Sequence, residues 1–204
     1  MTDGSIRLRV AGLRGALSGP FDLAVAAGEC LALTGASGSG KSLFLRMIAD
    51  LDPNEGEVFL DHVARSSMTA PAWRRRVVYH AAEAGWWHDD VASHFSGGAL
   101  TFARETAPRL GLSAALLDAA VARLSTGEKQ RLALLRSLAP DSPVLLLDEP
   151  TGALDPETTA MVEAVLRDRL ASRTTIVFVT HNEAQAERLG DRRFRMLDRR
   201  LVPA

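Results

Sequence analysis

The N-terminal part of the chain alternates loosely between apolar and polar residues at 5–10 and again at 21–26. A period of two is expected of a strand with one buried and one solvent-exposed face, so both stretches predict half-buried antiparallel strands. Residues 17–20 (Leu-Ser-Gly-Pro) lie between them and predict their turn. Further strands are predicted at 57–61 and 76–81. The first eighty residues are therefore expected to be rich in strands.

Three uninterrupted apolar runs have a different meaning, because they have no polar face. Such runs are typical of parallel strands that are covered on both sides. They occupy residues 29–34, 144–147 and 175–179. Between the last two, Asp155-Pro156-Glu157 opens a helix with a capping residue, a proline at its first position and an acid in its first turn. Strand, helix and strand in this order predict a right-handed crossover and an α/β fold.

The pattern changes at residues 88–122, which are rich in Ala and interrupted by Gly and Pro. This composition predicts short helices in a separate lobe, and a long helix is predicted after Ser125. The tail at 193–202 predicts a final hairpin. We therefore predict one domain over residues 1–204, in which the helical lobe spans about 88–124.

Composition narrows the function classes only a little. Of the 204 residues, 47% are apolar and 24% are charged, and the formal net charge is −1. This balance gives no support to nucleic-acid binding. No apolar run is long enough to span a bilayer, and no signal peptide is visible, so a cytoplasmic location is expected. The single cysteine, Cys30, lies in an apolar strand and is interpreted as a small core residue.

A glycine-rich loop follows the first apolar strand and precedes a helix predicted at about 41–50. Its sequence, Gly35-Ala36-Ser37-Gly38-Ser39-Gly40-Lys41-Ser42, matches the pattern G-x-x-x-x-G-K-[ST]. Glycines let backbone N–H groups curl around phosphates, and the helix N-terminus adds unpaired donors and partial positive charge. We expect Lys41 to reach the β- and γ-phosphates and the Ser42 hydroxyl to bind Mg²⁺. The loop predicts a nucleoside triphosphate site without specifying the reaction.

Two carboxylates, Asp148 and Glu149, end the second apolar run. They are predicted to lie at the carboxyl edge of the sheet, where ligands bind in open α/β folds. Asp148 is expected to hold Mg²⁺ through water, and Glu149 to polarise an attacking water. The alternative is a pair of solvated acids at a strand end.

Ser125-Thr126-Gly127-Glu128 opens the long helix. Ser125 and Glu128 have the spacing of a capping box, so the simplest interpretation is a well-capped helix. The same helix end also has the features that bind anions.

Taken in order, these segments resemble the ATP-binding subunits of ABC transporters. Leu124–Arg131 (LSTGEKQR) resembles the family signature, and the strand ending in Asp148-Glu149 resembles its acidic motif. Gly152–Asp155 resembles the D-loop, and Val179-Thr180-His181 the switch-histidine segment. The resemblance covers about residues 5–200. It implies a P-loop ATPase fold with a RecA-like parallel-sheet core, an N-terminal antiparallel β part and a small helical lobe.

The resemblance also implies a partner and a mechanism. Two cassettes, in a homodimer or heterodimer, would face head to tail, with each ATP between Gly35–Ser42 of one subunit and Ser125–Glu128 of the other. Glu149 would direct water in line at the γ-phosphate, while Lys41, His181, Mg²⁺ and the partner's signature helix stabilise charge. Closure of the dimer on ATP would supply a mechanical stroke.

Two residues that the family normally has are missing. The first is an aromatic residue that stacks on adenine. Its nearest equivalent is Leu13, which would keep apolar contact and lose stacking of about 1 kcal/mol. The second is a glutamine after the strand at 76–81, where Ala82 stands instead. Our hypothesis is that the adjacent Glu83 partly replaces it, because a carboxylate is a better Mg²⁺ ligand than an amide.

Aromatic and histidine residues cluster after this strand. Trp86-Trp87 has two open interpretations, core packing between the lobes or an exposed anchor for a partner. The resemblance implies that this region docks a cytoplasmic helix of a membrane subunit. His80, His88 and His94 fit no zinc-ligand spacing and are interpreted as structural.

Three functions are compatible with these motifs. The leading one is the ATP-binding subunit of a transporter whose integral membrane permease is a separate polypeptide, at the inner face of the cell membrane. Short bacterial export-type subunits, including iron-export and lipoprotein-releasing types, look most similar. The alternatives are a soluble ABC ATPase of translation or DNA repair, and another P-loop enzyme such as a small-molecule kinase. A translation or repair ATPase would normally need a second cassette, a coiled coil or zinc modules, and a more basic surface.

Overall fold

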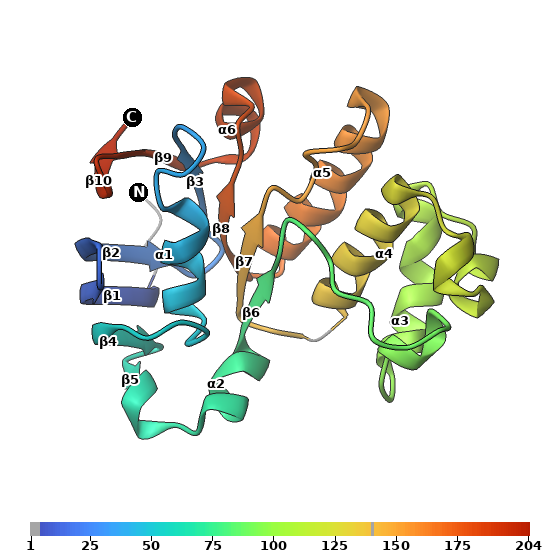
Figure 1. Ribbon diagram of the computed structural model, residues 1–204, viewed down its shortest axis with the longest axis horizontal. Coiled ribbons are helices and arrows are strands. Elements are labelled where there is room, and N and C mark those ends of the chain that lie inside the picture. Colours follow the sequence, from blue (N-terminus) through green and yellow to red (C-terminus); the bar gives the residue numbers. More distant parts are fainter. Residues whose placement is uncertain (1–4, 140) are drawn as a thin grey trace.

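The computed structural model describes residues 5–139 and 141–204, and two β-sheets form its framework (Figure 1). Residues 1–4 and 140, which belong to the predicted domain, lie outside the described residues. The larger sheet has the strand order β10-β9-β3-β8-β7-β6, and all neighbouring pairs except β10–β9 are parallel. Its strands are β3 (Cys30–Thr34), β6 (Val77–His80), β7 (Val144–Asp148), β8 (Thr175–Val179), β9 (Arg192–Leu197) and β10 (Arg200–Pro203). The predicted apolar strands and the C-terminal hairpin are confirmed.

The smaller sheet is antiparallel and has the order β2-β1-β4-β5. Its strands are β1 (Ile6–Gly15), β2 (Ser18–Ala26), β4 (Glu55–Leu60) and β5 (Val63–Ala64). The predicted turn at 17–20 is wrong, because β2 already begins at Ser18 and the turn is Ala16-Leu17. Pro20 is tolerated inside β2 because this strand lies at the sheet edge, where a missing N–H need not cost a ladder bond.

Six helices accompany the sheets among the described residues. They are α1 (Lys41–Ile48), α2 (Ala70–Arg76), α3 (Ala99–Thr106), α4 (Thr126–Leu138), α5 (Pro156–Ala171) and α6 (Glu183–Leu189). Short 3-10 turns occupy Arg65–Ser67, Ala92–His94, Ala107–Leu110, Ala114–Asp118 and Val121–Arg123. The segment predicted as a helical lobe therefore contains one α-helix and four 3-10 turns. None of the described helices is long and apolar enough to cross a bilayer.

The larger sheet separates two apolar clusters, and each central strand supplies alternate residues to both. In β3, Cys30 and Ala32 belong to one cluster, and Leu31 and Leu33 to the other. The first cluster includes apolar residues of the 88–124 segment and of α4, and the second includes α1 and the smaller sheet. Burial on both faces explains why these strands are uninterrupted apolar runs.

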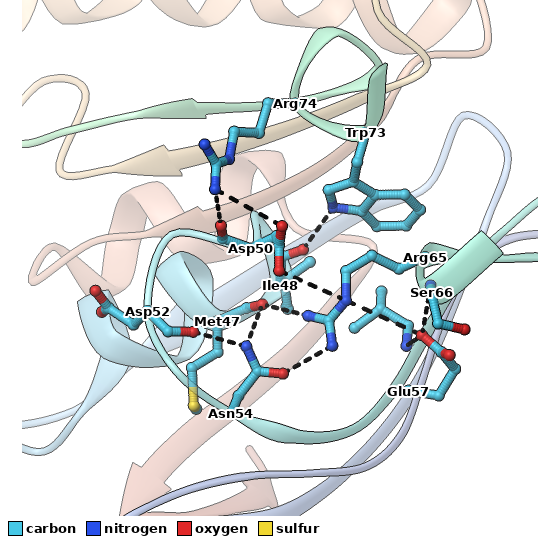
Figure 2. Close-up of polar contacts among 11 residues, drawn as sticks. Met47, Ile48, Asp50, Asp52, Asn54, Glu57, Arg65, Ser66, Trp73 and Arg74 are labelled. Atoms are coloured by element: carbon cyan, nitrogen blue, oxygen red, sulfur yellow. Dashed lines mark hydrogen bonds and ion pairs between the residues drawn. The ribbon is translucent and has the colours of Figure 1, made fainter. Parts of the chain in front are cut away.

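Helix α1 is held at its C-terminal end by side chains from the segment that follows β5 (Figure 2). Arg65 Nη1 donates to Met47 O at 2.9 Å, and Trp73 Nε1 donates to Ile48 O at 2.9 Å. The last carbonyls of a helix lack intrahelical partners and carry partial negative charge, so these donors suit them. Helix α2, which carries Trp73, was not predicted, because a short helix with one buried side chain shows no periodic pattern.

Candidate nucleotide site

The glycine-rich loop joins β3 to α1 and is closed around a lysine. Lys41 is only 5% exposed, and its Nζ donates to Gly35 O at 2.8 Å and to Ala36 O at 2.9 Å. Burial lowers the pKa of Lys41, while Glu149 and Asp148 oppose the shift. Gly35 has φ +139°, and a Cβ there would lie 2.7 Å from Met196 O, so only glycine fits. The ammonium is therefore held inside the loop by two backbone carbonyl oxygens, at the place where the sequence pattern predicts the phosphates.

Asp148 ends β7 with its side chain almost fully buried. Tyr79 of the neighbouring strand β6 donates its hydroxyl to Asp148 Oδ2 at 3.0 Å. Burial and the Asp148 carboxylate raise the pKa of Tyr79, so the phenol stays a donor. This bond orients one oxygen of Asp148. The sequence analysis missed Tyr79, whose only signal was its position on a strand that pairs with the acidic one.

Glu149, one residue beyond the end of β7, forms a pair with His181, two residues beyond the end of β8. His181 Nε2 lies 3.0 Å from Glu149 Oε1. Burial raises the pKa of Glu149, and His181 partly offsets the effect. Glu149 also has a φ of +49°, an uncommon conformation for a residue with a side chain. Because Gln130 Nε2 donates to Glu149 O at 3.2 Å and Glu149 N donates to Val179 O at 3.1 Å, the surrounding structure holds this strained backbone.

The loop, both acids and the histidine line one cleft of about 340 Å³. Among the residues predicted from sequence, its lining includes Ser37, Gly38, Gly40, Lys41, Ser42, Asp148, Glu149 and His181. The remaining loop residues Gly35, Ala36 and Ser39 lie in the same loop but do not line the cleft. Three segments that are far apart in the sequence therefore meet at the carboxyl edge of the sheet, as expected for this fold.

Two of the cleft residues are suitable for Mg²⁺. Ser42 offers a hydroxyl and Asp148 a carboxylate, and hard oxygen donors are what this ion prefers. Within the described part of the chain, no group of three or more His, Cys, Asp or Glu side chains is arranged to hold a metal ion. An ion at Ser42 and Asp148 would thus take its other ligands from phosphates and water, as Mg²⁺ commonly does.

The structure separates the two residues considered for the missing glutamine. Ala82 lines the cleft with Lys41, whereas the exposed Glu83 lines a neighbouring groove of about 360 Å³. That groove also contacts Lys129 and Gln130 of α4. Glu83 is therefore not brought together with Ser42 and Asp148, and its replacement of the glutamine remains a hypothesis.

The signature segment is on another part of the surface. Ser125 N donates to Glu128 Oε2 at 2.8 Å and Glu128 N donates to Ser125 Oγ at 3.3 Å, so the predicted capping box is confirmed. Ser125 and Thr126 are exposed, and Gly127 and Glu128 are half-buried. None of these four residues lines the cleft, and Figure 1 shows the start of α4 well separated from the loop before α1.

The predicted contact of Leu13 with adenine is wrong. Leu13 is fully buried beside Phe21 of β2, in the apolar cluster beneath the smaller sheet. Its side chain therefore has no route to a ligand. From the same hairpin, Leu17 reaches the cleft, and Arg199 reaches it from the turn between β9 and β10. The sequence analysis predicted that turn but did not connect its residue to the site.

A buried glutamine links the switch-histidine segment to the D-loop. Gln185 is 1% exposed and its Oε1 accepts from Thr180 Oγ1 at 2.8 Å. Its Nε2 donates to Thr151 Oγ1 at 2.9 Å. Thr180 directly precedes His181, and Thr151 directly precedes the D-loop. The sequence analysis missed Gln185, since nothing local marks a glutamine on a short helix.

The two tryptophans have different environments. Trp86 packs against the apolar cluster around α4, while Trp87 is 64% exposed. The guanidinium of Arg136 lies 5.0 Å from the Trp86 ring centre and 4.6 Å from that of Trp87. Core packing thus describes Trp86, whereas Trp87 is exposed, and its role as an anchor for a partner stays a prediction. The nearby His94 accepts from the Trp87 backbone N–H at 3.0 Å, which is a structural role.

Comparisons with known proteins agree with this geometry. The family model described as "ABC transporter" matches residues 19–152, which is more than half of the chain. The ATP-dependent lipid A-core flippase of Cupriavidus pinatubonensis is 34% identical over 81% of this chain and 31% of its own length. Protein STAR1 of Oryza sativa subsp. japonica is 37% identical over 83% of this chain and 52% of its own length. The sulfate/thiosulfate import ATP-binding protein of Nephroselmis olivacea is 38% identical over 81% of this chain and 51% of its own length.

Solved structures share the fold. A bacterial Atm1-family ABC exporter with ATP bound has a TM-score of 0.83 at 22% identity, over 99% of this chain and 39% of that one. A dimeric ATP-binding cassette in a post-hydrolysis state, bound to ADP and Pi, has a TM-score of 0.82 at 24% identity, over 95% and 96%. The chain spans only about a third to a half of the length of the curated relatives. The alternative of a small-molecule kinase is ruled out, and the chain belongs to the ABC transporter family.

Proposed function

We propose that this chain is the ATP-binding subunit of a transporter and that it works as a head-to-tail dimer with a second cassette. The observation that carries the proposal is that the cleft does not include the signature segment of its own chain. It contains the phosphate loop, both acids and His181, whereas the capped start of α4 at Ser125 is exposed elsewhere on the same chain. A second copy, or a related cassette, would supply that helix end to the open side of the cleft, where its unpaired N–H groups suit a phosphate.

Within such a dimer, each cleft residue has a role that its surroundings favour. Glu149 would accept a proton from the attacking water, and its raised pKa makes it a better base than a solvated carboxylate. His181, at 3.0 Å from Glu149, would orient that carboxylate and contact the γ-phosphate. Lys41 would exchange its bonds to the loop carbonyls for phosphate oxygens. When bound at Ser42 and Asp148, Mg²⁺ supplies charge neutralisation on the phosphates.

A separate integral membrane permease subunit would bind this dimer at the inner face of the cell membrane. The exposed Trp87 stacks on Arg136 and directly follows Trp86, which lines the groove at Glu83, so Trp87 is suited to anchor a helix of that partner. The names of the relatives, a flippase and an import protein, point to different directions of transport. Export, including the iron-export type that the signature resembles, therefore remains a prediction, and the substrate belongs to the permease.

Cross-linking tests the dimer directly. Cys30 is 1% exposed and burial raises the pKa of its thiol, so it leaves little background. One chain carries Ser37→Cys and the other carries Thr126→Cys, and both also carry Glu149→Gln. When the two chains are mixed in the presence of ATP and Mg²⁺, the two cysteines should form an intersubunit cross-link. Chains that both carry Thr126→Cys serve as the matched control. Cross-linking that is independent of ATP, or that is equally efficient in the control, would contradict the head-to-tail arrangement.

Co-purification from the native cell tests the transporter assignment. An integral membrane protein recovered with the chain, and lost in Trp87→Ala with Trp86 kept, would support it. Recovery of ribosomes or DNA instead would favour the alternative of a soluble ATPase in translation or repair.

A further inference from the structure

The nucleotide cleft has two ends, and only one has been assigned. The phosphate end is defined by Lys41, with Glu149 and His181 on the side of the reacting phosphate. A nucleoside triphosphate is longer than its phosphates, so the nucleoside must leave the loop on the opposite side. Apart from the loop and the residues around the acids, the cleft is lined by Leu17, Leu43 and Arg199.

Leu17 and Arg199 come from turns at opposite ends of the sequence and are joined by hydrogen bonds. Arg199 Nη1 donates to Leu17 O at 2.9 Å, and Gly19 N donates to Arg199 O at 3.4 Å. Figure 1 shows this C-terminal hairpin, β9–β10, beside β2 and the loop that precedes α1. Leu17 is 71% exposed, and Arg199 is also exposed. Both side chains are thus held at the cleft and open to a ligand.

The backbone of this turn lies in the left-handed region, as it also does in the β4–β5 turn at Asp61 and His62. Asp198 and Arg199 have φ values of +46° and +59°, which a two-residue hairpin turn of this kind requires. Asn and Gly are the usual residues there, because a longer side chain costs energy in the left-handed region. Among the described residues, Arg199 forms no ion pair that would explain its presence. Its guanidinium is instead directed to the β1–β2 turn, where it lines the cleft.

We propose that Arg199 and Leu17 form the nucleobase contact of this cleft and take the place of an aromatic ring. The guanidinium is flat, and only one of its five N–H groups is used by Leu17 O, so one face can stack on a purine. Leu17 supplies apolar surface beside it. This inference rests on ATP binding at Gly35–Ser42, and it adds a residue that sets affinity for the base.

The test compares ATP with inorganic triphosphate, which has the phosphates and no base. Equilibrium binding is measured with Mg²⁺ for the wild-type chain and for Arg199→Gly, which removes the guanidinium and suits the positive φ. ATP should bind about fivefold more weakly, as the loss of a partly exposed cation–π contact predicts, with triphosphate unchanged. The thermal unfolding midpoint should change little, because the relief of the turn by glycine offsets the lost hydrogen bond to Leu17 O.

Two matched controls separate the guanidinium from the backbone and from charge. Asp198→Gly relaxes the neighbouring turn residue, and Arg200→Ala removes the next positive charge, on a side chain that lines a different groove with Pro20 and Asp22. Both should bind ATP as the wild type does. The proposal is overturned if Arg199→Gly binds ATP as tightly as the wild type does. It is also overturned if the affinities of this variant for triphosphate and for ATP fall to the same degree.

A gain of binding completes the test. Leu17→Trp restores an aromatic ring at this end of the cleft and should tighten ATP binding several-fold, again without effect on triphosphate. Unchanged ATP binding would place Leu17 away from the base and overturn its role. A wild-type chain that binds neither ATP nor triphosphate would instead overturn the phosphate-loop assignment on which the inference rests.

Discussion

The phosphate-loop region and the signature region of this chain differ in how far one polypeptide completes them. Around the loop, Lys41 and Asp148 are buried, and Glu149 is held by bonds from three sides. At the start of α4, the side chains of Ser125 and Glu128 cap the helix by bonding to each other's backbone N–H, and Ser125 is exposed. The difference fits our proposal that the first region performs the chemistry and that the second contacts a partner cassette. Each prediction below tests one side of this contrast.

The largest effect is expected for Lys41→Ala. This change removes the buried ammonium, which has no substitute within the loop, so ATP binding should be lost. Equilibrium binding of ATP with Mg²⁺ measures it. Ser125→Ala, on the other side of the contrast, is the control and should bind ATP normally as a monomer. An equal loss of ATP binding in both variants would mean that the phosphate loop and the signature segment of one chain act together in binding.

Glu149→Gln should slow hydrolysis by a factor of about 100 or more while ATP still binds, because an amide cannot accept the proton from water. Steady-state phosphate release and ATP affinity, measured on the same variant, check that hydrolysis slows while ATP binding is kept. An ATP-bound dimer should accumulate, and size-exclusion chromatography with light scattering would detect it. Turnover near the wild-type rate would falsify the assignment of Glu149 as the base.

His181→Ala should change the pH dependence of hydrolysis as well as its rate. Burial raises the pKa of Glu149 and His181 lowers it, so loss of His181 should raise that pKa further. Glu149 acts when deprotonated, and the acidic limb of the rate profile should therefore move to higher pH. The turnover number measured across pH tests this shift. An unmoved limb, with a lower plateau, would assign His181 to the phosphate alone.

Ser125→Ala should break the capping box and reduce stability by about 1 kcal/mol. Its more informative consequence is on the dimer, because hydrolysis should fall at low protein concentration and recover partly at high concentration. The concentration dependence of ATPase activity measures this effect. A uniform loss at every concentration would indicate a helix defect and not a weakened contact between subunits.

The smallest effect is expected for Glu83→Ala. Glu83 lines the groove beside α4 and not the cleft with Ser42, so any contribution to Mg²⁺ binding must come through a change in conformation. A modest increase in the Mg²⁺ concentration needed for half-maximal hydrolysis is expected. If the Mg²⁺ dependence and the rate are unchanged, Glu83 has no role in the site. Ala82→Gln would then test whether a glutamine restores the contact with Mg²⁺ and the attacking water.

Much of the fold followed from local pattern. The apolar runs identified β3, β7 and β8 because burial on both faces removes polar residues from a strand. The turn before β2 was missed because Gly19-Pro20 is a strong turn signal, and only the edge position of β2 allows it inside a strand. Helix α2 was missed because its one anchor, Trp73, bonds to a carbonyl twenty-five residues earlier.

The sequence by itself determined the family, and it identified the phosphate loop, the acidic pair and the histidine that line the cleft, because each of these is a short segment with its own chemistry. Tertiary structure alone decided which other residues accompany them. Tyr79 and Gln185 join the site through strand pairing and a buried hydrogen-bond network. Leu13 leaves it because that part of β1 faces the core, while Arg199 enters it from the last hairpin. These are contacts between distant segments, and no local pattern specifies which distant side chain will arrive.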